Sequence, residues 1–469
     1  MGGESFHKKK ILLLCGGMLL VCAAIVLVLI FASGTESSGI GAVGEVERIT
    51  VSYGKNPASE MNFCWYTTQA HKGTFIQYLP KISDAVPDFQ EEGVSTKEGY
   101  IEQVAELYPA AGQESAPYPE LQERTVVRHR LYLSDLESGT AYWYRIGDRQ
   151  TNTWSRPAVF RTAAAAGSAE PFSFLLATDS QGFVYSHFEL WSDCISRAGQ
   201  RHADAAFLLH LGDFVEDGMN ALQWQSLLNL PNQLLRGLPV MPVAGNKDTR
   251  HVFDYFTLGS PADTEPLTAG WYSFDYADTH FTILYTGDDR SDLSKKQLKW
   301  LKQDLADSDA RWKIVVMHKA PYSNANHADD KEIVALRKQL LPVFDAYGVD
   351  AVLQGHDHYY FRSAPVRDGA AGTYTETKEQ FAGDAGIGEM TVLRDVRGTV
   401  YFINGSAGVK QYSKTFRDMP EICAAEALRL SDPTYSYCTV TEERFTVYTY
   451  TVDRNNGSIS LVEAWCIEK

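Results

Sequence analysis

The sequence predicts two folded domains: an all-β sandwich, followed by an α/β layered domain whose β-sheet sandwich is flanked by helices. Three observations support this fold class. The chain has 469 residues, which is too long for one ordinary hydrophobic core. Apolar and polar residues alternate repeatedly between residues 46 and 163. Beyond residue 171, short apolar runs alternate with stretches of helical period.

The first domain, residues 46–163, contains segments with the two-residue period of β-strands: Ile49–Tyr53, Met61–Tyr66, Val127–Leu133 and Tyr142–Ile146. Ser83–Glu123 is polar and poorly periodic, so we interpret it as a long insertion in the sandwich. The small residues of Ala163–Ala169 then indicate a domain boundary.

The second domain, residues 171–469, has predicted apolar strands at Phe172–Ala177, Ala206–Leu211, Val240–Ala244, Ile314–Met317 and Ala351–Leu353. Ser294 and Gln297 form a capping box that begins a helix, and Gly348 can end a second helix. Tyr272–Tyr276 and Phe281–Tyr285 predict a hairpin joined across Ala277–His280.

The N-terminal residues 1–34 predict a cytoplasmic stub and a transmembrane anchor. Ile11–Ala32 is an uncharged run of 22 residues, and about 20 apolar residues are enough to span a bilayer. The lysines of Lys8–Lys10 favour a cytoplasmic N-terminus, so after a linker at residues 35–45 we expect both domains to be extracytoplasmic. The alternative is a signal peptide cleaved after this run, which would give a secreted protein.

The composition is that of a globular protein, with 44% hydrophobic and 22% charged residues. The formal net charge of −16 argues against nucleic acid as the main partner. If the substrate is itself an anion, the site needs positive charge from another source, and a metal ion would supply it.

Polar side chains with metal-binding chemistry follow the predicted strands of the second domain. They are two carboxylates, three imidazoles and one amide oxygen: Asp179, Asp213, Asn246, His318, His356 and His358. The carboxyl ends of strands in α/β sheets are where sites assemble, and three of these residues directly follow a glycine. This donor set suits two divalent or trivalent metals that share a carboxylate rather than one tetrahedral zinc.

The motif order D-x-Q, G-D-x-x-E, G-N-K-D, V-V-M-H and G-H-D-H resembles the calcineurin-like metallophosphoesterase superfamily. The sequence Leu136–Tyr142 also resembles the tyrosine corner of fibronectin type III sandwiches. A fibronectin-like domain before the motifs makes the chain most similar to the purple acid phosphatase branch.

The resemblance implies a role for each matching residue. Asp179 and His358 would hold the first metal, Asp213 would bridge, and Asn246, His318 and His356 would hold the second metal. Glu216 stands where purple enzymes have the tyrosine that colours their iron, so we expect no purple chromophore. Gln181 stands where other members have a histidine ligand, and it is a weaker donor.

Lys247 is the largest departure from the family pattern, which has a phosphate-contacting histidine at that position. A lysine keeps a positive charge near phosphate, and flanking metals would lower its pKa and allow proton donation. It is equally consistent with a site that binds phosphate compounds without turnover. His251 and His327 are the candidate substitutes for the missing histidine.

We therefore expect hydrolysis of a phosphate monoester of the acid phosphatase type, or alternatively of a diester, with water activated by two ions of Fe, Zn, Mn or Mg. The expected partners are a phosphorylated small molecule and, through the N-terminal helix, a membrane. The alternatives are a catalytically impaired phosphoesterase that acts as a binding protein, and a surface adhesin that binds through its β domain.

Overall fold

The computed structural model describes residues 46–67, 73–259, 270–287, 293–325, 327–383, 386–412 and 424–469. Val46–Lys469 forms one compact unit. The predicted anchor and linker, residues 1–45, lie outside the described residues. In the part of the chain that the structure describes, no helix combines the length and apolar composition needed to cross a bilayer.

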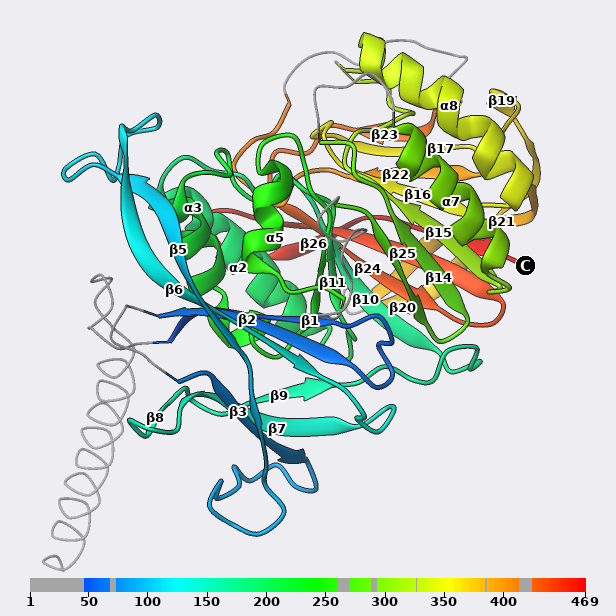
Figure 1. The fold of residues 1–469 in the computed structure, drawn as a ribbon. Coiled ribbons are helices and arrows are strands. Elements are labelled where there is room, and N and C mark those ends of the chain that lie inside the picture. The colour runs from blue at the N-terminus through cyan, green and yellow to red at the C-terminus, as the bar shows by residue number, and fades with distance from the viewer. Residues whose placement is uncertain are drawn as a thin grey trace, which may run out of the picture. The chain divides into compact units, whose positions relative to one another are not determined.

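The N-terminal domain is a β sandwich of two sheets (Figure 1). The first sheet has the strand order β1 (Glu47–Tyr53), β2 (Met61–Thr67), β6 (Leu121–Leu133) and β5 (Tyr100–Pro109). The second has the order β4 (Ser95–Glu98), β3 (Phe75–Pro80), β7 (Ala141–Asp148) and β8 (Thr153–Trp154), and β9 (Ala158–Arg161) also pairs with β7.

The predicted tyrosine corner is confirmed. The hydroxyl of Tyr142 accepts a hydrogen bond of 2.9 Å from the backbone N–H of Glu137, which lies five residues upstream. The sandwich core behind it is aromatic, with Phe63 5.0 Å from Tyr144 and 5.5 Å from Phe160 between ring centroids. Burial of these rings fixes the register of the strands that carry them.

The segment that we interpreted as an insertion contributes β4, β5 and the first residues of β6. β5 and β6 form a long hairpin beside α3 (Ala221–Asn229), and Leu107 pairs with Asn220 across this junction. The first half of β5 is exposed to solvent on both faces, which explains why its sequence lacks the apolar alternation of a half-buried strand.

The second domain consists of two further large sheets and the helices around them (Figure 1). The eight-stranded sheet has the order β12 (Val240–Pro242), β11 (Leu208–His210), β10 (Phe172–Ala177), β24 (Thr434–Val440), β25 (Arg444–Val452), β26 (Ile459–Glu468), β21 (Gly386–Arg397) and β20 (Thr373–Gly383). The seven-stranded sheet has the order β13 (Tyr272–Tyr276), β14 (Thr279–Ile283), β15 (Trp312–Val316), β16 (Ala351–Gln354), β22 (Val400–Asn404), β17 (Tyr360–Ser363) and β23 (Ala424–Leu428). A small hairpin joins β18 (Val366–Arg367) to β19 (Ala370–Ala371).

The helices are α2 (Tyr185–Arg201), α3, α4 (Asn232–Leu235), the 3-10 helix η1 (Thr249–His251), α5 (Val252–Tyr255), α7 (Lys295–Asp307) and α8 (Lys331–Tyr347). The serine half of the predicted capping box of α7 is confirmed, because Ser294 Oγ accepts from the N–H of Gln297 at 3.1 Å, but the Gln297 side chain bonds the backbone of Tyr285 and not that of Ser294. Gly348 ends α8 with a left-handed φ of 66°. The predicted hairpin forms, but the expected four-residue connection is wrong: Ala277 turns with a φ of 49° and β14 begins at Thr279.

The two large sheets pack through aromatic rings. Phe174 of β10 stacks on Phe207 at 4.9 Å and meets Phe281 of the other sheet edge-on at 5.6 Å. All three rings are fully buried. The strands β10, β11 and β12 are mutually parallel, as are β14, β15, β16 and β22, so each set presents its carboxyl ends together.

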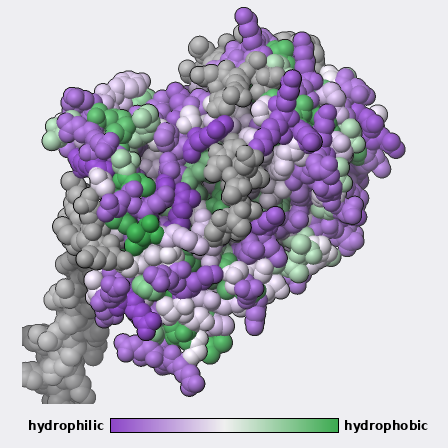
Figure 2. Space-filling view, in the orientation of Figure 1, coloured by the Kyte–Doolittle hydropathy of each residue, from purple (hydrophilic) through white to green (hydrophobic). Residues whose placement is uncertain are grey.

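The surface contrasts with this core. The face in Figure 2 is mainly hydrophilic, and its hydrophobic residues form small separate patches. The N-terminal and second domains are joined by a buried network in which Arg48 and Tyr255 both contact the carboxylate of Glu106, at 2.8 and 2.9 Å. This network fixes the end of β5 nearest the hairpin loop against the second domain.

Candidate metal centre

Five strand ends bring the predicted ligands to one edge of the second domain. Asp179 follows β10, Asp213 follows β11, Asn246 follows β12, His318 follows β15, and His356 and His358 follow β16. Ligand atoms of Asp179, Asp213 and His318 all lie within 4.8 Å of one another, and all three residues are buried. The sequence separation between these residues makes this convergence a product of the fold, not of local structure.

The backbone at these strand ends is strained. Asp179, Asp213 and His356 have φ angles of 54°, 52° and 71°, in the left-handed region that non-glycine residues rarely adopt. Residues held in this way cluster at functional sites, where surrounding structure enforces the conformation. The strain turns each side chain sharply out of its strand toward the shared centre.

The glycines that precede the ligands allow a close approach. A Cβ atom on Gly245 would lie 2.1 Å from Asp213 Oδ1, and one on Gly212 would lie 2.9 Å from His318 Nδ1. Neither position can accept a side chain without moving a ligand. The expectation that glycine is required next to the site is confirmed at these two positions.

His318 presents a lone pair to the centre. Its Nδ1 lies 2.8 Å from the carbonyl oxygen of Leu211, which can only accept, so Nδ1 carries the proton. In the neutral ring Nε2 is then an acceptor, whereas in the protonated ring it donates toward Asn246 Oδ1 at 3.0 Å and Asp213 Oδ1 at 3.4 Å. Nε2, Asn246 Oδ1 and Asp213 Oδ1 thus converge on one point, which a proton or a metal ion can occupy.

His358 repeats this arrangement on the other side of the centre. Its Nδ1 lies 3.0 Å from the carbonyl oxygen of Lys410, which leaves the Nε2 lone pair facing Asp179 Oδ1 at 3.2 Å. Asp179 Oδ2 accepts from Thr178 and from the N–H of His356, whereas the buried Oδ1 receives no hydrogen bond from the described residues. A buried carboxylate oxygen of this kind is costly unless a cation binds it.

Gln181 adds another acceptor. Its amide is satisfied when the nitrogen donates to the backbone carbonyls of Asp179 and Asp213, each 3.2 Å away. The amide oxygen then lies 3.4 Å from Asp213 Oδ2 and 3.5 Å from His358 Nε2. His356 completes the cluster, with its Nδ1 2.9 Å from Asn246 Oδ1.

The electrostatics of the cluster follow from burial and mutual proximity. Burial alone would raise the pKa of Asp213, but His318 and the N–H of Lys247 lower it to about 2. Burial would lower the pKa of His318, yet the carboxylate of Asp213 raises it to about 9. Burial and the neighbouring His318 and His327 hold the pKa of His356 well below its usual value.

Glu216 and Lys247 form an ion pair beside the cluster. Lys247 Nζ lies 3.1 Å from Glu216 Oε1, and Lys410 Nζ contacts Glu216 Oε2. Burial lowers the pKa of Lys247, but Glu216 more than offsets this and the pKa is raised. Glu216 therefore acts against the lowering by metals that we expected, and its carboxylate binds lysines.

The two candidate substitute histidines have different positions. His327 lies at the rim of the cluster, with its ring 4.4 Å from that of His356 and its Nδ1 2.7 Å from Asp330. His251 instead pairs with Asp254 at 3.3 Å and is half exposed. Among the two, only His327 contacts a residue of the cluster through its ring.

Residues that the sequence did not single out also build the centre. Asp248 is fully buried and accepts from the N–H groups of Phe214 and Gly245, both at 2.7 Å, so it ties two ligand loops together. Tyr412 stacks on His358 at 4.4 Å. Asp248 had a weak signal in G-N-K-D, but the sequence around Tyr412 and Lys410 carried none.

The donor set fits metal ions. Oxygen and imidazole acceptors converge without a thiolate, which suits Fe, Zn, Mn or Mg. The proton on Nδ1 of two histidines, fixed by backbone carbonyls, is the arrangement that orients imidazole for a metal. Acceptors that face acceptors are repulsive alone and become favourable when cations lie between them.

Family comparisons agree with this geometry. Residues 172–360 match the calcineurin-like phosphoesterase family, and residues 46–162 match the purple acid phosphatase N-terminal domain. The structure of a purple acid phosphatase, PPD1 from yellow lupin seeds, superposes with a TM-score of 0.70 at 16% identity, covering 91% of this chain and 74% of that one. This likeness identifies the shared fold.

Sequence relatives point to the same family. Human acid phosphatase type 7 is 26% identical over 432 residues, which is 84% of this chain and 85% of the relative. An uncharacterized Mycobacterium tuberculosis protein is 29% identical over 211 residues. That alignment spans 40% of this chain and 39% of the mycobacterial protein.

Proposed function

Since the chain belongs to the purple acid phosphatase-like branch of the calcineurin-like phosphoesterases, we propose that it hydrolyses phosphate monoesters at a dinuclear metal centre. The observation that carries this proposal is the set of buried acceptors facing one another. Asp179 Oδ1, which has no donor in the part of the chain that the structure describes and lies 3.2 Å from Nε2 of His358, is the plainest case.

We assign Asp179, Gln181 and His358 to the first ion, and Asn246, His318 and His356 to the second. Asp213 is the proposed bridge, because its Oδ1 faces His318 and its Oδ2 faces the oxygen of Gln181. When bound, two such ions would stabilise charge on the phosphoryl oxygens and supply a water of lowered pKa.

The protein's own groups have separate roles. The N–H of Lys247 donates to Asp213 Oδ1 at 2.8 Å and orients that carboxylate. The side chain of Lys247 is 40% exposed, so we propose that its ammonium leaves Glu216 and binds a phosphate oxygen of the substrate. Glu216 keeps the lysine protonated, which favours an anchoring role over proton donation.

A direct experiment tests the reaction. The purified protein, loaded with manganese, iron or zinc, is assayed with p-nitrophenyl phosphate and bis(p-nitrophenyl) phosphate. We expect the monoester to be hydrolysed faster and chelator to abolish both activities. Absence of turnover in protein that holds stoichiometric metal would overturn the proposal.

The ion pair of Lys247 and Glu216 favours one second candidate, a phosphate-binding protein with impaired turnover. A lysine whose pKa is raised is a poor general acid at neutral pH. Lys247→His should then increase kcat while leaving metal content unchanged. An adhesin that binds through its β domain would need no metal at all, so metal analysis separates that reading from both others.

We propose in addition that the uncharged run at residues 11–32 anchors both domains outside the cytoplasm. Fractionation of cells expressing the full chain and a variant without residues 1–34 tests this. The full chain should remain in the membrane fraction after a high-salt wash, and the shortened chain should not. Equal release of both would contradict the anchor.

A further inference from the structure

The tip of the β5–β6 hairpin belongs to the N-terminal domain but lies against the second domain. Its loop, residues 110–120, is held by hydrogen bonds from Ala110 to Glu120, from Gln113 to Ala110 and from Glu120 to the side chain of Gln113, at 2.8, 2.9 and 2.7 Å. The tip therefore has a defined conformation although most of its residues are exposed.

Both strands of the hairpin are fixed to the second domain by polar contacts. Arg48, fully buried, holds Glu106 of β5, and the hydroxyl of Tyr255 donates to the same carboxylate. Arg128 of β6 binds Asp254 at 2.6 Å. With both strands anchored, the position of the tip is set by the domain junction.

The tip carries an aromatic residue to the rim of the metal centre. Tyr118 lies edge-on to Phe183, with ring centroids 5.4 Å apart, and 81% of Tyr118 stays exposed. Phe183 follows Gln181 by two residues, and Lys410 Nζ lies 4.9 Å from the centre of its ring. The same Lys410 contacts Glu216, which binds Lys247.

Tyr118, Phe183 and Lys410 thus form an aromatic and cationic rim, defined by these three residues. An exposed tyrosine that a separate domain holds over a charged site gains little from burial, so its position is not explained by packing. Exposed aromatic faces beside cations are suited to stacking a planar ring that carries an anionic group.

Resting on the proposed function, we propose that the substrate is a phosphate ester whose organic group is a planar aromatic ring. The ring stacks on Tyr118 and Phe183, while the phosphate faces Lys247 and the metal centre. The N-terminal domain therefore selects the substrate through the tip of its hairpin, in addition to its structural role.

Binding of non-hydrolysable phosphonates tests the rim independently of turnover. Phenylphosphonate and methylphosphonate are titrated calorimetrically into the full-length, manganese-loaded protein. We expect phenylphosphonate to bind more tightly, and Tyr118→Ala or Phe183→Ala to weaken it about threefold to tenfold while methylphosphonate is unaffected. Tyr118→Ala should also raise KM for p-nitrophenyl phosphate without changing kcat.

Tyr100→Ala is the matched control. Tyr100 lies at the opposite end of β5, is 59% exposed, and meets Tyr132 edge-on at 5.9 Å, much as Tyr118 meets Phe183. Its replacement should change neither affinity. Phe183 is partly buried, so circular dichroism confirms folding of that variant, and the exposed Tyr118 gives a second, independent test.

The outcomes separate the two proposals. Equal affinity for both phosphonates, no binding of either, or a ring preference that survives Tyr118→Ala would overturn the rim. Ring-dependent phosphonate binding without hydrolysis of any ester would support the rim and overturn the proposed hydrolase.

Discussion

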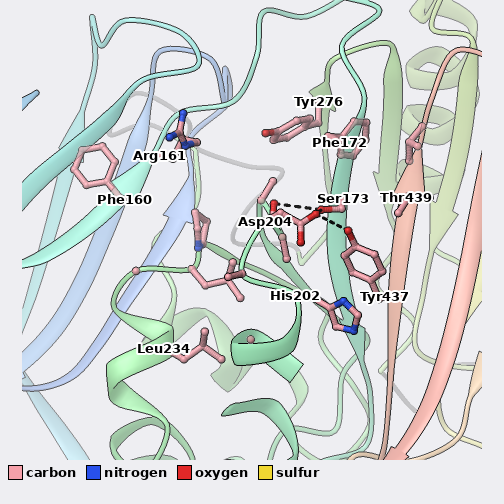
Figure 3. A pocket seen from close by; sticks show the side chains of 18 of the residues that line it. Phe160, Arg161, Phe172, Ser173, His202, Asp204, Leu234, Tyr276, Tyr437 and Thr439 are labelled. Atoms are coloured by element: carbon pink, nitrogen blue, oxygen red, sulfur yellow. Dashed lines mark hydrogen bonds between the residues drawn. The ribbon is translucent and has the colours of Figure 1, made fainter. Parts of the chain in front are cut away.

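Two polar clusters lie at opposite ends of β10 and β11, and their groups differ in kind. At the amino ends is a cavity of about 830 Å³ in which Asp204 accepts hydrogen bonds from Ser173, at 2.8 Å, and from Tyr437 (Figure 3). Its donors and acceptors satisfy one another. At the carboxyl ends, Asp179 Oδ1 receives no hydrogen bond from the described residues and lies 3.2 Å from Nε2 of His358.

The two ends of these strands therefore differ in how their polar groups are paired. In the cavity at the amino ends, the carboxylate of Asp204 accepts from two hydroxyl groups of the protein. The strand ends around Asp213 keep strained backbone and unmatched acceptors, a combination that costs stability unless a cation is bound. Stability and function are thus separated between the two ends of the same strands.

The largest expected effect is a loss of activity when a carboxylate is replaced at the carboxyl ends of β10 and β11, but not at their amino ends. Asp213→Asn should reduce kcat for p-nitrophenyl phosphate by more than about a thousandfold, because the proposed bridging charge is lost. Elemental analysis should show fewer than two ions per chain. Asp204→Asn, at the other end of the strands, should keep both metal and activity, and equal losses in the two variants would refute the contrast.

Loss of the buried ion pair between Arg48 and Glu106 should lower the stability of the fold. Glu106→Ala leaves the buried guanidinium of Arg48 without its main partner, so the free energy of unfolding should fall by about 3–5 kcal/mol in urea titrations. Glu102→Ala, on the same strand, breaks the surface pair with Arg128 and should cost about 1 kcal/mol or less. A similar cost for the two variants would show that burial does not set the value of the pair.

The hydrogen-bonded cluster around His280 should make the stability of the protein depend on pH. Burial would lower the pKa of His280, but hydrogen bonds to Asp275 and Asp304, at 2.7 and 3.0 Å, raise it to about 9. A folded pKa above the unfolded value of about 6.5 adds stability below pH 6.5, and this stability is lost as the pH rises through 9. The loss should be roughly 3 kcal/mol.

Urea titrations of the metal-free protein between pH 6 and pH 10 measure this slope. His280→Gln removes the titrating group and should flatten the curve over that range. If the variant keeps the slope of the unmodified protein, His280 is not its source.

The smallest expected effect is an increase, not a decrease, in the free energy of unfolding. In metal-free protein, Asp179→Asn replaces an acceptor that faces His358 with an amide that can donate, and asparagine tolerates the φ of 54°. The unfolding free energy should rise by about 1–2 kcal/mol in chelator. In excess manganese the order should reverse, because the unmodified protein alone gains the full stabilisation from bound metal.

Thermal unfolding with and without metal checks this inversion. Asp204→Asn serves as the control, because its carboxylate already accepts from Ser173 and Tyr437 and should gain nothing from the change. A metal-free Asp179→Asn that is less stable than the unmodified protein would show that the cluster is not repulsive on its own.

The positions of the ligands at the strand ends could be predicted because an apolar run, and often a glycine, directly precedes each ligand in the sequence. The same holds for Tyr142, whose corner motif is contiguous, and for the Ser294 cap. Their geometry depends on neighbours in sequence, which periodicity and motif spacing describe.

The partners of Glu216 could not be predicted. Its contact Lys410 lies 194 residues away and follows β22 without a recognisable pattern. The β5–β6 hairpin could not be predicted for a different reason. The first half of β5 is exposed to solvent, so its sequence lacks the apolar alternation of a half-buried strand. Contacts that form only when separate loops meet at one edge carry no signature in either loop.

The central claim is that the acceptors at the strand ends hold two metal ions. Elemental analysis of the protein after exposure to manganese, zinc and iron and removal of loosely bound metal tests it directly. The account predicts two ions per chain, reduced in Asp213→Asn and unchanged in Asp204→Asn. A protein that retains no stoichiometric metal, or retains it equally without the Asp213 carboxylate, would contradict the account.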